Sequence, residues 1–294
     1  MQTGSGEKKE LVDPNTINAE GTTAMDWWFV SPNGKYVSYG LSENGSEQSV
    51  LYTLNTETME KVDTPIDGCR YASVGWMPDE SGFFYSRKLD GNKPGEIDTE
   101  QSVRFHKLGT APDSDEVIAK GTIKEGIIVS AIDNEGKWLL ITEYMGSSGK
   151  AKLDVYNIAS KTLKPVANFD SIYEGEVYNG NIYLKTDKDN ALNWKIVKVN
   201  CETLEWSTAI PENEKDVIEF FTISNGSFLL VKMHDVASRV SVVTIDGKAE
   251  TEIKLPVLGN IQGLSADPSA SEIFMSFSSF AYPFRTNFRR NYGQ

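Results

Sequence analysis

Apolar residues along this chain recur in short runs, and each run follows a polar turn. Clear copies of this turn and strand stand at 31–39, 78–85 and 133–140, and weaker copies at 179–184, 225–230 and 269–274. The strands of the six copies begin at Tyr36, Phe83, Trp138, Ile182, Phe228 and Ile273, with spacings of 47, 55, 44, 46 and 45 residues. A repeat of roughly 40–50 residues is typical of one blade of a β-propeller.

Each repeat contains four short strands separated by turn residues, which is the antiparallel meander of a propeller blade. In the first repeat we expect strands at 27–30, 36–41, 49–54 and 60–65. No segment of helical length has a 3.6-residue apolar period, so the pattern predicts an all-β fold. Two packed β-sandwich domains are the alternative, although sandwiches have no reason to repeat one turn and strand at constant spacing.

The number of repeats predicts an incomplete propeller. Five whole units are expected, at 26–65, 70–120, 127–168, 172–211 and 217–257. Residues 260–280 supply only the first two strands of another unit, and 10–12 form a single strand before the first. A propeller closes by pairing its first and last blades, so an open ring exposes apolar sheet faces and unpaired edges. We therefore expect a sample that is not monomeric or is partly unfolded.

Composition changes this picture little. The chain has 294 residues, 39% of them apolar, and a net charge of −13 that argues against nucleic acid and anionic membranes as partners. No apolar run is long enough to span a membrane and no secretory signal is visible, so a cytoplasmic location is expected. A periplasmic location stays open if the natural N-terminus lies upstream. Cys69 and Cys201 fall in different repeats and are interpreted as small buried or edge residues.

The motifs of catalysis and metal binding are missing from the sequence. No G-x-S-x-G is present, and Gly146-Ser147-Ser148-Gly149 reads as a hairpin turn. The two histidines, His106 and His234, lie in predicted strands and are interpreted as packed or hydrogen-bonded residues rather than catalytic ones. Asp187-Lys188-Asp189-Asn190 lacks the glycine and distal glutamate of a calcium loop and reads as a hairpin tip. No catalytic residue, metal site or cofactor is therefore predicted.

An ordered series of motifs nevertheless resembles one family. It consists of Asp13-Pro14-Asn15-Thr16, Gly21-Thr22-Thr23-Ala24, 39–47, 70–76, His106-Lys107-Leu108-Gly109-Thr110, 215–219 and His234-Asp235-Val236. The series is similar to the propeller domain of the prolyl oligopeptidase family of serine peptidases, over residues 10–283 or so. That resemblance implies a seven-bladed propeller, open between its first and last blades, which caps an α/β-hydrolase domain with a Ser-Asp-His triad.

Against the family pattern, this chain begins at the end of the first blade and stops within the seventh. Both parts of the hydrolase domain are missing, so no triad residue can be carried over. We expect a partial propeller domain at 1–283 and an aberrant, basic, strand-poor tail at 284–294. A frameshift, a premature stop or a truncated gene model would account for the tail, and an internal start for Met1. A natural stand-alone propeller is the alternative.

The resemblance also implies a function, which is selection of substrates rather than bond breaking. In the intact enzyme the propeller admits short proline-containing peptides, which the hydrolase domain cleaves after proline. Tyr71, which follows Arg70, matches a family position that lines a distal substrate subsite, and Ile127 matches a second position of this kind. Alternatively, both side chains simply pack between sheets. Three hypotheses stay open: an inactive peptidase fragment, a stand-alone module that binds a peptide or protein, and an enzyme completed by another chain.

Overall fold

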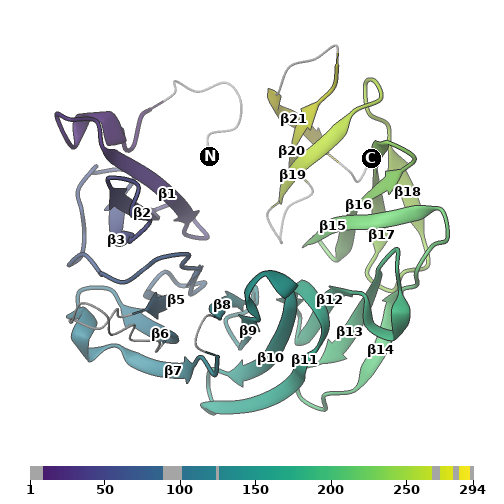
Figure 1. Ribbon diagram of the computed structural model, residues 1–294, viewed down its shortest axis with the longest axis horizontal. Coiled ribbons are helices and arrows are strands. Elements are labelled where there is room, and N and C mark those ends of the chain that lie inside the picture. The colour runs from purple at the N-terminus through teal and green to yellow at the C-terminus, as the bar shows by residue number, and fades with distance from the viewer. Residues whose placement is uncertain (1–8, 89–100, 124–125, 267–271, 281–284, 292–294) are drawn as a thin grey trace. The chain divides into compact units, whose positions relative to one another are not determined.

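The computed structural model describes residues 9–88, 101–123, 126–266, 272–280 and 285–291. Almost all regular structure in these ranges is β-strand, and the helices are single 3₁₀ turns, such as η1 (Pro14–Thr16) and η2 (Pro112–Ser114) (Figure 1). The all-β prediction is confirmed. None of the described helices is long and apolar enough to cross a membrane.

The chain divides into two compact units. The first contains residues 1–148 and 152–168, and the second contains residues 149–151 and 169–294. Strand β11 (Thr162–Tyr178) passes from one unit to the other, with its residues up to Asn168 in the first unit.

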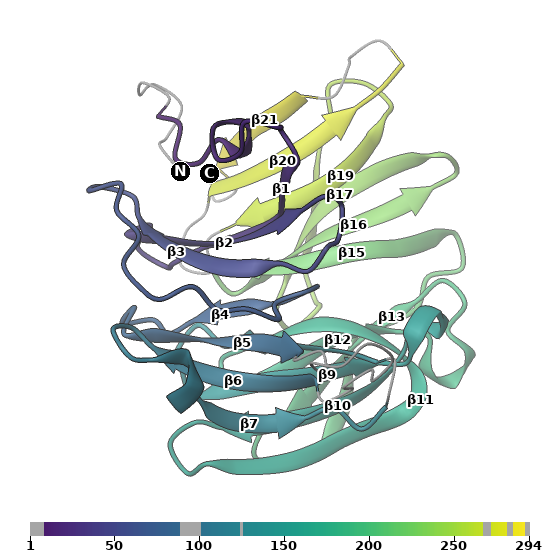
Figure 2. The same ribbon diagram turned by 60° about the vertical axis from the view of Figure 1, so that its left-hand side comes forward.

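The first unit consists of three successive antiparallel meanders, and Figure 2 shows the strands of the second meander one above another. Their strands are β1 (Thr23–Val30), β2 (Tyr36–Glu43) and β3 (Val50–Asn55); β4 (Val74–Trp76), β5 (Gly82–Lys88), β6 (Gln101–Lys107) and β7 (Glu116–Lys120); and β8 (Ile127–Ile132), β9 (Trp138–Tyr144), β10 (Lys150–Asn157) and the start of β11. Each begins with the turn and strand that recur in the sequence.

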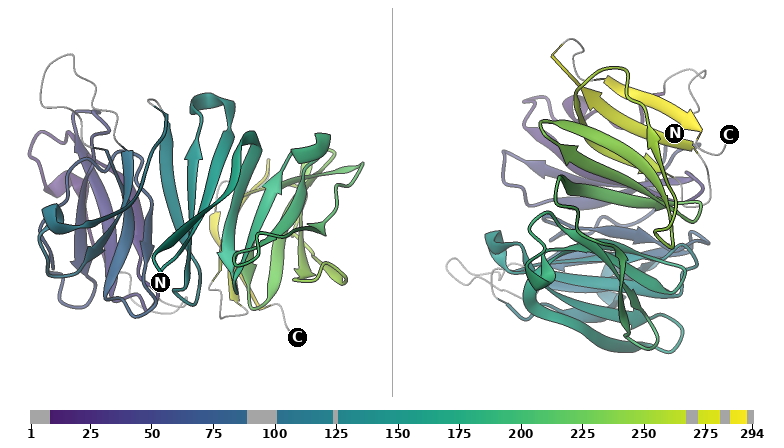
Figure 3. Two further views of the ribbon diagram at one scale, coloured as in Figure 1. Left: turned by 90° about the horizontal axis from the view of Figure 1, so that it is seen from below. Right: turned by 90° about the vertical axis from the view of Figure 1, so that its right-hand side faces the viewer.

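The second unit continues the same plan. Its strands are the end of β11 with β12 (Asn181–Thr186), β13 (Lys195–Asn200) and β14 (Trp206–Ile210); β15 (Asp216–Ser224), β16 (Ser227–His234), β17 (Ala237–Thr244) and β18 (Glu250–Ile253); and β19 (Asn260–Ala266), β20 (Glu272–Ser278) and β21 (Arg285–Asn291). The right-hand view of Figure 3 shows the last two meanders in green and yellow.

Apolar clusters form the core between successive sheets. In the first unit, Trp76, Phe83 and Tyr85 pack with Leu51 and Ile66 between the first two meanders. In the second unit, one cluster centres on Phe228 and another on Phe277. Because side chains alternate between the faces of a strand, a central strand such as β5 supplies apolar residues to both neighbouring interfaces and is buried along almost its whole length. In β16 the buried stretch is 228–231.

Three sequence predictions about strands are wrong. Residues 10–12 form no strand, because they have no strand partner; Leu11 and Val12 pack instead against the cluster around Tyr39. The fourth strand of the first repeat is reduced to isolated bridges at Lys61 and Ile66.

Residues 260–280 supply two strands, β19 and β20, as predicted. The tail, predicted to be strand-poor, contains a third strand, β21, which pairs with β20. Pairing of a strand uses the backbone, and charged residues are common in edge strands, so a basic sequence does not prevent it. Residue 284, residues 292–294 of the tail and the predicted turn residues 269–271 lie outside the described part of the chain. The domain boundary at 283 stays a prediction.

Candidate functional site

Tyr71 lies in a tight turn that leads into β4. The amide of Ala72 donates to the carbonyl of Cys69 over 3.3 Å, and Tyr71 has a φ of 52°, in the left-handed region that a side chain disfavours by about 1–2 kcal/mol. Half of the Tyr71 side chain is exposed, so it is not packed between sheets. A strained, exposed aromatic residue is a candidate for a functional contact.

The turn is held by Trp27 in β1 and by Ser49, which lies just before β3. The indole N–H of Trp27 donates to the carbonyl of Cys69 over 3.2 Å, and the amide of Cys69 donates to the carbonyl of Ser49 over 3.0 Å. Gly40 in β2 makes room for this indole, because a Cβ atom at position 40 would overlap the Trp27 ring. The backbone that carries Tyr71 is therefore tied to the first sheet.

Glu47, in the connection between β2 and β3, fixes the side chain of Tyr71. Its Oε2 atom accepts hydrogen bonds from the Tyr71 hydroxyl and from Nη2 of Arg70, each at 2.6 Å. The Arg70 guanidinium lies 4.8 Å from the centre of the Tyr71 ring, a distance typical of a cation–π contact. The three side chains thus form one exposed cluster, which we call the Tyr71 cluster.

Charge holds the Tyr71 cluster together. Hydrogen bonds from Tyr71 and Arg70 lower the pKa of Glu47 below its usual value, and the bond to Glu47 raises the pKa of Arg70. Glu47 is therefore ionised at neutral pH and holds the phenol in one orientation. The cluster can offer an ordered aromatic ring to an apolar group, but it contains no nucleophile with an adjacent base.

Ile127 begins β8, as predicted, and is half-buried opposite Tyr144. The buried carboxylate of Glu143 holds the connection before it: it accepts hydrogen bonds from the amides of Thr122 and Ile123 and from the Thr122 hydroxyl. No hydrogen bond or ring contact joins Tyr71 to Ile127 within the described part of the first unit.

The two candidate positions nevertheless precede adjacent strands. The amide of Ser130 in β8 donates to the hydroxyl of Ser73, which lies just before β4, over 2.8 Å. Tyr71 stands two residues before Ser73, and Ile127 stands three residues before Ser130. Both positions therefore lie at the end of the sheet where the first strand of each meander begins. Their role as substrate contacts stays a prediction.

The residues that the sequence analysis did not assign to catalysis or metal binding have structural roles. His106 is fully buried, with its ring nitrogens at 2.9 Å from Asp115 and 3.1 Å from Asp63, and His234 Nδ1 lies 2.5 Å from Asp216. Cys69 and Cys201 are buried, as predicted, and neither is part of a disulfide bond. Residues 146–148 and 188–190 lie in hairpin connections, also as predicted.

Sequence reasoning missed Glu47 as a partner of Tyr71. The two residues are 24 positions apart, and nothing in either segment alone indicates the pairing. A signal is present in the turn chemistry, because Glu47 follows Gly45-Ser46 in a polar loop, but such loops usually carry charged residues for solubility alone.

Comparison with known proteins supports one family along almost the whole chain. The family model of the prolyl oligopeptidase N-terminal β-propeller domain matches residues 1–290. The chain is 28% identical to a prolyl endopeptidase of Elizabethkingia miricola over 291 residues, and 26% identical to prolyl oligopeptidase A of Galerina marginata over 312 residues. These matches cover 95% and 96% of this chain but only 40% and 42% of the relatives.

Solved structures show the same correspondence. A structure from a study of two prolyl endopeptidases matches 98% of this chain and 43% of its own, with a TM-score of 0.89 and 25% sequence identity. Prolyl oligopeptidase B of Galerina marginata matches 93% of this chain with a TM-score of 0.81 and 20% identity. The same enzyme has been solved with a 35-residue hydrolysis and macrocyclization substrate. These matches favour the propeller over the two-sandwich alternative.

Proposed function

We propose that this chain, which belongs to the prolyl oligopeptidase family as its N-terminal β-propeller domain, selects short proline-containing peptides for an α/β-hydrolase domain. The chain spans about 40% of the length of the curated relatives that it matches, and those relatives are prolyl endopeptidases and prolyl oligopeptidases. The match corresponds to their propeller and not to their catalytic domain. Selection of peptides, rather than hydrolysis, is the part of the activity that such a domain can perform.

The observation that carries this proposal is the geometry of Tyr71. The ring is half exposed and is held by Glu47 and Arg70. Because the ring is already ordered, stacking of a peptide side chain on it would cost the protein little conformational entropy. An aromatic pair contributes about 0.5–1.5 kcal/mol beyond its buried area, which corresponds to a change of about two- to tenfold in affinity. In this proposal Tyr71 contacts a peptide side chain on the amino-terminal side of the proline, and Ile127 adds an apolar surface.

Peptide binding tests the role of Tyr71. NMR titration of the ¹⁵N-labelled chain with acetyl-Phe-Gly-Pro-amide should shift resonances near Tyr71, and acetyl-Ser-Gly-Pro-amide should bind about two- to tenfold more weakly. Tyr71→Ala should abolish this preference for phenylalanine. Tyr71→Phe keeps the ring without the bond to Glu47 and should retain part of it. Equal binding of the two peptides to the unsubstituted chain, or an unchanged preference in Tyr71→Ala, would show that Tyr71 is not a substrate contact.

Catalysis requires a separate measurement. We expect no hydrolysis of a chromogenic Gly-Pro peptide by the purified chain and no labelling by a fluorophosphonate probe, because the family's nucleophile belongs to the hydrolase domain. Turnover that follows the labelled 294-residue chain would refute the division of labour proposed here. Because this assay reports only chemistry, it can fail independently of the binding assay.

A further inference from the structure

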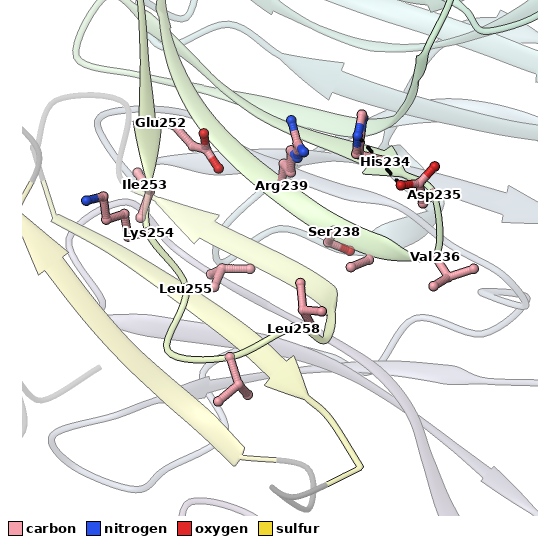
Figure 4. A pocket seen from close by; sticks show the side chains of 12 residues that line it. His234, Asp235, Val236, Ser238, Arg239, Glu252, Ile253, Lys254, Leu255 and Leu258 are labelled. Carbon is pink, nitrogen blue, oxygen red and sulfur yellow. Dashed lines mark ion pairs between the residues drawn. The ribbon is translucent and has the colours of Figure 1, made fainter.

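A groove of about 690 Å³ lies within the second unit, between the start of β17 and the connection from β18 to β19. Figure 4 shows charged side chains, including Arg239 and Glu252, along one side of the groove and Leu255 and Leu258 on another. An amphipathic groove of this size can hold two or three residues of a peptide.

The frame of the groove is tied together through Ser238. Its backbone amide donates to the carbonyl of Gly259 over 2.9 Å, and its buried hydroxyl accepts from the amide of Ile261 over 3.1 Å. The same hydroxyl donates to Glu219 over 3.1 Å. These bonds join β17 to the connection from β18 to β19, so the groove exists before any ligand arrives.

Apolar side chains stand in solvent along this groove. Val236, in the turn between β16 and β17, is 88% exposed, and Leu258 is 85% exposed; Val257 beside it is 38% exposed. Single exposed apolar residues are common, but three that line one concave surface indicate a place where apolar groups bind.

A cation without a partner faces the same groove. The structure describes the side chains of four arginines: Arg70 pairs with Glu47, Arg87 with Asp67, and Arg104 donates to a serine hydroxyl. Arg239 has no hydrogen bond or ion pair to any described residue, although the chain has a net charge of −13.

The other charged or titratable groups that line the groove are His234, Asp235, Glu252 and Lys254, and Lys254 already takes part in another interaction. His234 is engaged by Asp216 at 2.5 Å and lies 3.8 Å from Asp235. Glu252, like Arg239, has no partner among the described side chains and lines the same groove. A ligand that fits both Arg239 and Glu252 carries a negative charge near Arg239 and is neutral or positive near Glu252.

We propose that this groove binds the C-terminal end of short peptides. Arg239 pairs with the peptide's α-carboxylate, and the surface of Leu255, Val257 and Leu258 holds the last side chain, which is apolar. Glu252 favours a basic residue at the preceding position and disfavours an acidic one. The site differs from the Tyr71 cluster and does not depend on the function proposed above.

A free α-carboxylate suits the groove better than other anions do. Arginine binds a carboxylate through two parallel hydrogen bonds, and one guanidinium neutralises one carboxylate. Phosphate or nucleic acid would bring two or more negative charges close to Glu252 and Asp235, on a protein that is already strongly acidic. The apolar surface adds affinity only for a ligand that carries an apolar side chain next to its charge.

Three dipeptides test the proposal by NMR titration of the ¹⁵N-labelled chain. Acetyl-Lys-Leu with a free carboxylate should bind saturably and shift resonances of residues 234–239 and 252–258. Its C-terminal amide should bind about tenfold more weakly, because hydrogen bonds to a charged group typically change affinity by at least that factor. Acetyl-Glu-Leu should also bind more weakly than acetyl-Lys-Leu.

Two substitutions complete the test. Arg239→Gln should weaken binding of acetyl-Lys-Leu about tenfold and remove the difference between the acid and the amide. Lys107→Gln removes one positive charge in the first unit and should leave the affinity within about twofold. No saturable binding up to about 10 mM, equal binding of acid and amide, or an unaffected Arg239→Gln variant would overturn the proposal.

Discussion

The buried ion pairs of His106 predict that the stability of the fold falls as the pH rises above about 6.5. His106 is fully buried in β6, and both ring nitrogens face carboxylates: Nδ1 lies 2.9 Å from Asp115, and Nε2 lies 3.1 Å from Asp63. Asp63 comes from the segment that follows β3, whereas Asp115 precedes β7. A protonated ring therefore joins the first two meanders of the first unit by two charge-assisted hydrogen bonds.

The sign of the pH effect follows from the pKa of His106. Burial by itself lowers this pKa, but the hydrogen bonds that the ring donates to Asp115 and Asp63 outweigh burial and raise it above the ordinary value of 6.5. The stabilisation is therefore complete below about pH 6.5 and is lost as the pH rises through the pKa of the folded state. One proton changes the free energy of unfolding by at most about 1.4 kcal/mol per pH unit.

His106→Gln measures the size of the effect. Removing one partner of a buried ion pair costs about 3–5 kcal/mol, and glutamine can still donate to one carboxylate, so we expect a loss of about 3 kcal/mol at pH 6. The loss should shrink by pH 9. Urea unfolding followed by tryptophan fluorescence reports on this region, because Trp76 packs on Phe83, whose ring lies 5.2 Å from that of His106.

Tyr85 and Cys69, which lie close to His106, do not titrate in the same pH range. Burial and the hydrogen bond to Asp115 raise the pKa of Tyr85, and burial raises the pKa of Cys69 to about 12. His234→Gln is the matched control, because His234 is only partly buried and lies in the other unit. A loss below about 1 kcal/mol in His106→Gln at pH 6, or a loss that does not shrink by pH 9, would refute the reasoning.

Two further predictions concern the second unit. Burial raises the pKa of Glu176 from 4.5 to about 7, so ionisation of this carboxyl group destabilises the fold as the pH rises from 4.5 through 7. Glu176→Gln keeps the acceptor for the amide of Ile223 and should raise the free energy of unfolding at pH 8, measured with urea, by about 1 kcal/mol or more. An equal gain at pH 4 would contradict this cause. Gly175→Ala should lower the melting temperature far more than Gly226→Ala does. A Cβ atom at position 175 would overlap the backbone of Tyr183, whereas the space at Gly226 is open and only its φ of 68° is unfavourable. An equal fall in melting temperature for both variants would show that the strand spacing at position 175 relaxes easily.

The repeat could be predicted from sequence because the signals that define it are local. The Asn179-Gly180 and Asn225-Gly226 turns have positive φ at both residues, which suits a two-residue hairpin, and apolar strands follow at once. The same local reasoning failed where pairing decides the outcome. Residues 10–12 have strand-like composition but no partner, whereas β21 has a basic sequence and a ready edge in β20.

Contacts between side chains distant in sequence could not be predicted. His106 was correctly interpreted as a packed strand residue, yet its two carboxylates lie 43 residues before it and 9 after it. The motif that points to Tyr71 likewise does not include Glu47, which orients the tyrosine. Such partners depend on how the meanders stack, which a single sequence does not encode in any short pattern.

Topology nevertheless indicates where the residues of the two proposed binding sites lie in each meander. Glu47 lies in the connection from the second to the third strand, and Tyr71 in the segment that leads to the first strand of the next meander. In the second unit, Val236 and Leu258 occupy the same two connections. Because strand direction alternates within every meander, these two connections lie at the same end of each sheet. The repeat therefore places these two connections at one end of each sheet, and they carry different side chains in the two units on the same strand frame.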